Sequence, residues 1–117
     1  MAGLLSRAFE RRSADQRDAD ELREDSEKAG CGLIASCSNR AMVTIHGELR
    51  WVSMRPVDGV PSLEAEIYDG SDAVTLVWLG RRRIEGVRAG KRLTAHGRIG
   101  RRGTDRVIYN PRYELDA

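Results

Sequence analysis

The chain has 117 residues, which is room for one domain with a modest hydrophobic core. Hydrophobic residues make up 40% of it, and no apolar run reaches the roughly 18 residues of a membrane-spanning helix, so the sequence predicts no membrane contact. The first residues lack the apolar segment of a signal peptide, and we therefore expect a cytoplasmic protein.

The net charge of +2 is distributed unevenly along the chain. Residues 1–30 contain six basic and eight acidic residues, whereas residues 79–106 contain ten basic residues against Glu85 and Asp105. Positive charge concentrated in one stretch is typical of proteins that bind a polyanion. Apart from Lys28 and Lys91 every basic residue is arginine, whose guanidinium group binds phosphate through two parallel hydrogen bonds.

Residues 1–30 are interpreted as a charged helical extension, because they are rich in Ala, Glu, Arg, Asp and Leu and contain no proline. Ser13–Gln16 matches a capping box, so a second helix is expected to start there. The later part has few apolar residues, which predicts a solvated or partly disordered helix. Leu5 and Phe9 are the candidates to dock on the rest of the chain or on a partner.

From Ala41 the hydrophobic period changes from 3.6 to 2, which indicates strands. The predicted strands are 43–50, 63–68, 73–79, 93–99 and 106–110, and Pro111 predicts the end of the last one. Gly47, in mid-strand, is expected at a bend, and the connector 80–91 is too short for a full helix. The expected core residues are Val43, Ile45, Leu49, Leu63, Ile67, Leu76, Leu93, Ile99 and Val107.

Together these features predict a mainly β fold: a five-stranded barrel preceded by an N-terminal α-helical extension. The predicted boundaries are 1–30 for the extension, 31–41 for a linker and 42–115 for the barrel.

Three phrases resemble the oligonucleotide/oligosaccharide-binding fold, the OB-fold. Residues 43–49 resemble its first strand with the bend glycine, and residues 84–99 resemble the glycine-bracketed run into its fourth strand. Residues 108–113 resemble the end of the fifth strand in the wedge domain of RecG helicases, and residues 40–115 are similar to a group of small actinobacterial OB-fold proteins. The chain has no G-x-x-x-x-G-K-[ST] nucleotide loop, so the resemblance implies a binding module without a motor.

In OB-fold proteins the ligand lies across the second and third strands and is clamped by loops. The resemblance places those loops at 53–61, 80–84 and 100–105 of this chain. They carry six arginines that are expected to converge on one side of the barrel: Arg55, Arg81, Arg82, Arg83, Arg101 and Arg102.

Trp51 and Tyr68 are the aromatic side chains expected to stack on bases. Glu64 and Glu66 alternate with apolar residues, so they are expected to point outward on the second strand. Two carboxylates there would repel a phosphate backbone. This favours contact through the loops over a strand lying along the sheet.

No nucleophile–base set and no metal-binding motif is present, so we expect a protein without catalytic residues, metal or cofactor. Cys31 and Cys37 are interpreted as reduced thiols, and His46 and His96 as solvated histidines.

The leading hypothesis is a nucleic-acid-binding protein for single-stranded or branched nucleic acid, with DNA favoured over RNA. The rival hypothesis is a protein-interaction module in which the barrel or the N-terminal helix contacts another protein.

Overall fold

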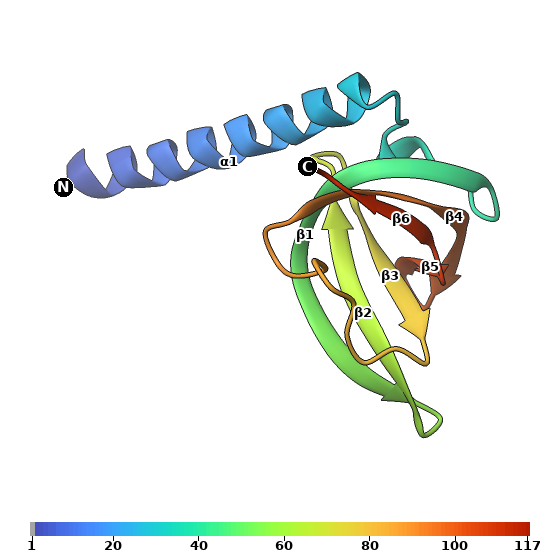
Figure 1. The fold of residues 1–117 in the computed structure, drawn as a ribbon. Helices are drawn as coiled ribbons and strands as arrows, with labels where there is room; N and C mark the ends of the chain where they lie inside the picture. The colour runs from blue at the N-terminus through green and yellow to red at the C-terminus, as the bar shows by residue number, and fades with distance from the viewer. Residues whose placement is uncertain (1) are drawn as a thin grey trace.

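The computed structural model describes the backbone of residues 2–117 and the side chains of residues 13–117. One long helix precedes a set of strands (Figure 1). In chain order the elements are α1 (Ala2–Lys28), the 3-10 helix η1 (Ile34–Ser36), β1 (Met42–Val57), β2 (Val60–Tyr68), β3 (Ala73–Leu79), β4 (Arg92–Arg102), β5 (Asp105–Tyr109) and β6 (Arg112–Leu115).

Five strands form a closed ring in the order β1-β2-β3-β5-β4, and the ring closes because β1 also pairs with β4. β3 and β5 are parallel, and the other pairs are antiparallel. The mainly β fold with an N-terminal helix is therefore confirmed. β5 ends before Pro111, as predicted, but it is not the last strand, because β6 follows it and pairs with β4.

Apolar side chains fill the inside of the ring, and eight of the nine expected core residues are buried. The exception, Val43, is half-buried at the edge of the interior cluster. Val107 is buried on the opposite face of β5, since its neighbour Ile108 belongs to the interior cluster and successive side chains alternate. Gly47, which was expected at a bend, lies where β1 closely approaches the end of β2: a Cβ there would be 2.5 Å from the backbone oxygen of Tyr68.

The predicted loop over 53–61 is wrong. Pairing between β1 and β2 continues to Val57 and Val60, so Arg55 lies in a strand of a long hairpin. Only Asp58 and Gly59 form the turn, and both have positive φ angles, 49° and 77°. A two-residue turn of this kind matches the twist of the paired strands, and Asp-Gly is among its preferred sequences.

The predicted loop over 100–105 is also shorter than expected. Arg101 and Arg102 are the last residues of β4 and pair with Arg106 and Asp105 of β5. The turn consists of Gly103 and Thr104 alone. Both arginines therefore start from a hydrogen-bonded strand, which holds their backbone more firmly than a loop would.

The segment 31–41, predicted as a linker, contributes to the core. Ile34 in η1 is fully buried in the interior cluster, and its backbone N–H donates to Asp69 over 2.8 Å. Between β3 and β4 there is no helix, as predicted, and Ile84 and Val87 of this connector are buried. Cys31 and Cys37 form no disulfide, and burial raises the pKa of both thiols.

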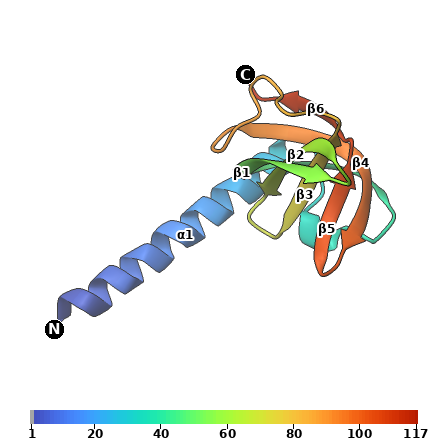
Figure 2. The ribbon, with the colours of Figure 1, turned by 90° about the horizontal axis from the view of Figure 1, so that it is seen from below.

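α1 is one continuous helix, so the second helix start expected at Ser13 is wrong. Its C-terminal part lies against the ring, where Ala19 and Leu22 are buried, and its N-terminal part projects away (Figures 1 and 2). The later part of the helix was predicted to be solvated or partly disordered. This is wrong for the side of the helix that packs on the ring, because Ala19 and Leu22 are buried there. The side chains of Leu5 and Phe9 lie outside the described residues.

Candidate nucleic-acid interface

A cleft of about 430 Å³ opens on the outer face of β2 and β3. Four predicted site residues line it together: Trp51, Arg55, Arg101 and Arg102. The remaining lining residues are Glu64, Glu66, Asp72, Ala73, Val74, Thr75, Thr104, Asp105 and Arg106. The long β1–β2 hairpin forms one wall and the end of the β4–β5 hairpin forms the other, so residues some 50 positions apart in the sequence share one site.

Arg102 is tied to Glu64 by two hydrogen bonds of 2.8 and 3.1 Å. These bonds to Glu64, more than any other contact, raise the pKa of Arg102. The Glu64 carboxylate is only 2% exposed, so it does not face the solvent as a free repelling charge, contrary to expectation. Arg102 is likewise no free phosphate-binding group, because its guanidinium fork is engaged.

The Arg102 side chain reaches from β4 to β2, and β5 and β3 lie between these strands. Val77 and Val107 are buried although they lie on the outer face, where alternation places them with Glu64. We infer that the Arg102 stem covers this apolar floor, as long arginine side chains often do. The ion pair therefore shapes the floor of the cleft.

Arg55 and Arg101 are the free cations of the cleft. Both are exposed, and neither forms an ion pair with any side chain that the structure describes. Trp51 is 39% exposed, so one part of its indole ring is open to a ligand. By contrast Arg106 is paired with Asp72 at 3.1 Å.

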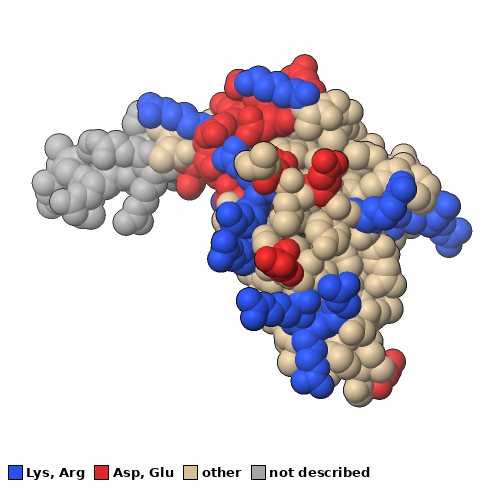
Figure 3. Space-filling view, in the orientation of Figure 1, with Lys and Arg blue, Asp and Glu red and all other residues tan. Residues whose placement is uncertain are grey.

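The triplet Arg81–Arg83 is exposed but does not line the cleft. Arg81 follows the end of β3, where the N–H of Gly80 donates to the carbonyl of Pro61 over 2.8 Å, so the triplet lies beside the turn end of the β1–β2 hairpin. The predicted convergence of three arginine groups therefore holds for two of them. In Figure 3 the Lys and Arg side chains form separate groups, one over the β3–β4 connector, and acidic side chains gather where α1 meets the ring.

Arg50 covers one face of the Tyr68 ring, so a base cannot stack on that face. The Arg50 guanidinium lies 4.6 Å from the centre of this ring. Arg50 in turn pairs with Asp18 of α1 at 2.7 Å and with Glu48 at 3.0 Å. Tyr68 therefore belongs to the junction between α1 and the ring, beside the cleft.

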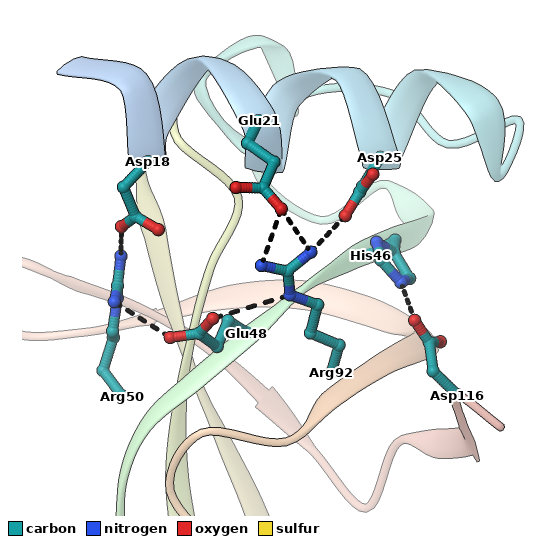
Figure 4. A network of polar contacts seen from close by, with 8 residues as sticks. All are labelled: Asp18, Glu21, Asp25, His46, Glu48, Arg50, Arg92 and Asp116. Atoms are coloured by element: carbon teal, nitrogen blue, oxygen red, sulfur yellow. Dashed lines mark hydrogen bonds and ion pairs between the residues drawn. The ribbon is translucent and has the colours of Figure 1, made fainter. Parts of the chain in front are cut away.

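A second arginine completes this junction (Figure 4). Arg92 of β4 pairs with Asp25 and with Glu21 of α1, and it also contacts Glu48. These partners raise the pKa of Arg92 against the opposing effect of its desolvation, which is the largest single contribution. The acidic residues in the second half of α1 were the sequence signal for a contact between the helix and basic residues of the ring. The sequence does not show which arginines these acidic residues contact.

His46 is buried and bonded to Asp116 at 2.8 Å, so its expected solvation is wrong. His96 of β4 is paired with Thr44 of β1, two residues before His46, and its ring nitrogen contacts the Thr44 hydroxyl. Among the described side chains no three His, Cys, Asp or Glu residues are placed to hold a metal ion. In the described part of the chain, no helix has the length and apolarity to cross a membrane.

No family model and no curated protein matches the chain. A solved structure of RecG bound to a three-way DNA junction is similar, with a TM-score of 0.51 and 21% sequence identity. The similarity covers 64% of this chain but only 11% of the RecG chain, and at this identity it shows a shared fold. The predicted likeness to RecG is therefore confirmed at the level of the fold.

Proposed function

We propose that the five-stranded ring is an OB-fold barrel and that the chain is a non-catalytic nucleic-acid-binding protein of the cytoplasm. Its ligand is single-stranded or branched DNA, bound without a metal or cofactor. The observation that carries this proposal is the cleft, in which an exposed indole and two unpaired arginines meet on the outer face of β2 and β3.

The chemistry of the cleft suits a nucleic-acid strand. Arg55 and Arg101 stand on opposite walls, so they can bind successive phosphates of a strand that crosses between them. Trp51 supplies a flat apolar surface for a base, and such stacking contributes about 1–3 kcal/mol per base. Arg102 neutralises Glu64, which removes one of the two carboxylates that argued against a ligand on this face.

A branched ligand is supported by two further features. The triplet Arg81–Arg83 is exposed beyond the end of β3 and outside the cleft, so it can contact a second arm of a junction whose first arm lies in the cleft. The similar part of RecG belongs to a protein whose structure was solved on a three-way DNA junction. The DNA in that structure is also the reason for favouring DNA over RNA as the ligand.

Fluorescence anisotropy with labelled oligonucleotides tests the proposal. The full chain is titrated with a three-way junction, a single strand and a duplex over a series of salt concentrations. Replacing both Arg55 and Arg101 by Glu should weaken binding about 100-fold at low salt and flatten the slope of log affinity against log salt by about 0.7–0.9 per lost contact. The control variant is Arg112→Glu, an exposed arginine of β6 outside the cleft, which should bind almost like the unmodified chain.

The rival proposal is a protein-interaction module, and the projecting N-terminal part of α1 is the observation that favours it (Figure 2). It predicts only weak, structure-independent attraction to DNA, with the same loss of affinity per replaced arginine in the double variant and in the control. That result would overturn the nucleic-acid proposal.

A further inference from the structure

Glu66 is the feature of the cleft that phosphate binding does not explain. It is half-buried, it lines the cleft, and its carboxylate has no hydrogen-bond or ion-pair partner among the described side chains. Two of the neighbouring acids are engaged: Glu64 accepts from Arg102, and Asp72 pairs with Arg106. The third, Asp105, is exposed beside the β4–β5 turn, whereas Glu66 is half-buried opposite Trp51. An unengaged carboxylate in a cleft for a polyanion repels phosphate, so its presence calls for a ligand group that donates hydrogen bonds.

Glu66 stands directly opposite Trp51. The two are partners in the antiparallel register of β1 and β2, just after the irregularity between Leu49 and Trp51. Directly opposed side chains of such a pair have Cβ atoms about 4.5–5.5 Å apart and share one face of the sheet. Both residues line the same cleft. A base stacked on the indole therefore has one edge within reach of the Glu66 carboxylate.

The carboxylate decides which base fits. An ionised carboxylate only accepts hydrogen bonds, and its two oxygens match a pair of parallel N–H donors. On guanine, N1–H and the N2 amino group form such a pair along the Watson–Crick edge. Adenine and cytosine present an amino group beside an acceptor nitrogen, and thymine presents one N–H between two carbonyls, so each would bring an acceptor against the carboxylate.

We propose that Glu66 is a specificity-determining residue that selects an unpaired guanine stacked on Trp51. This inference rests on the proposed function and names the base that its cleft prefers. The guanine must be unpaired, because pairing in a duplex occupies the edge that Glu66 reads. Arg55 and Arg101 would hold the flanking phosphates, which offsets their repulsion by Glu66.

The test uses the full chain and single strands of thymidine that carry one central guanine, adenine, cytosine or thymine. A single guanine avoids four-stranded association of guanine runs. The guanine strand should bind about ten-fold more tightly than the other three. Inosine, which lacks the N2 amino group, should lose most of this preference, whereas 7-deazaguanine, which keeps the Watson–Crick edge, should retain it.

Glu66→Gln is the decisive variant. It should bring the guanine strand close to the adenine strand, and it should leave the affinity for the all-thymidine strand equal or higher, because a negative charge is removed. The matched control is Glu85→Gln, an exposed carboxylate of the β3–β4 connector, which should keep the full preference.

The outcomes separate this inference from the proposed function. Measurable binding without a guanine preference would overturn the inference, and so would a preference that survives Glu66→Gln. If none of the strands or junctions binds at low salt, the proposed function itself fails.

Discussion

Arginines occupy both the cleft and the junction between α1 and the ring, but the two regions use them in opposite ways. At the junction Arg50 and Arg92 are paired with carboxylates of α1 and with Glu48. In the cleft Arg55 and Arg101 have no acidic partner among the described side chains. Net charge along the chain therefore does not reveal which cations remain for a ligand, because tertiary contacts engage some of them.

Arg102 lies between these two cases, since it belongs to the cleft but is engaged by Glu64. This pair has a structural role, because it neutralises the buried Glu64 carboxylate on the outer face of the sheet.

The largest effect is expected for Arg102→Ala. It leaves the Glu64 carboxylate buried without its cation, and breaking a buried pair in this way costs about 3–5 kcal/mol. Urea unfolding measures the loss. The neighbouring variant Arg101→Ala should stay within about 0.5 kcal/mol of the unmodified chain. Equal costs for the two variants would contradict the assignment of one as engaged and the other as free.

Deleting residues 1–30 should lower the free energy of unfolding by about 2–3 kcal/mol and leave the ring folded. The loss arises mainly because Leu22 no longer buries its side chain, which is fully enclosed in the intact chain. Circular dichroism reports the β structure and urea unfolding reports the loss. An unfolded spectrum would mean that the ring depends on α1. Leu22→Ala, with the helix still present, should account for most of the effect.

Replacing Arg81, Arg82 and Arg83 by Glu should weaken binding to a three-way junction about ten-fold, or roughly 1.4 kcal/mol, with the fold unchanged. This is less than the effect expected at the cleft, because the triplet lies beyond it. Anisotropy on junction and single strand measures the difference, and the junction should lose more. A larger loss than that of the Arg55 and Arg101 double variant would move the main binding site to the connector.

The smallest effect is expected for Arg50→Met, which removes a partly exposed ion pair with Asp18 and the cation over Tyr68. Such contacts contribute about 0.5–1 kcal/mol each near the surface. Urea unfolding at low and high salt measures the change. DNA affinity should be unaffected, and a clear loss of affinity would place Arg50 among the free cations.

The sequence predicted the fold more fully than the site. The hydrophobic pattern located all five ring strands, because a half-buried strand must alternate. Of the nine residues predicted for the core, eight are buried and seven of these belong to the interior cluster. β6 was missed since Pro111 interrupts the pattern before it. Two of the three arginine-bearing loops, 53–61 and 100–105, were predicted too long, because exposed polar residues in a hairpin arm look like a loop when the partner strand is not known.

What the sequence determined by itself is the order of the five ring strands, the alternating core and the concentration of arginine after residue 79. What only the tertiary structure decided is the pairing of charges. Arg102 meets Glu64 across two intervening strands, and Arg92 meets a helix some 70 residues away in the chain. Such contacts follow from ring closure and helix docking, so no local pattern records them, and they determine which arginines are left to bind a ligand.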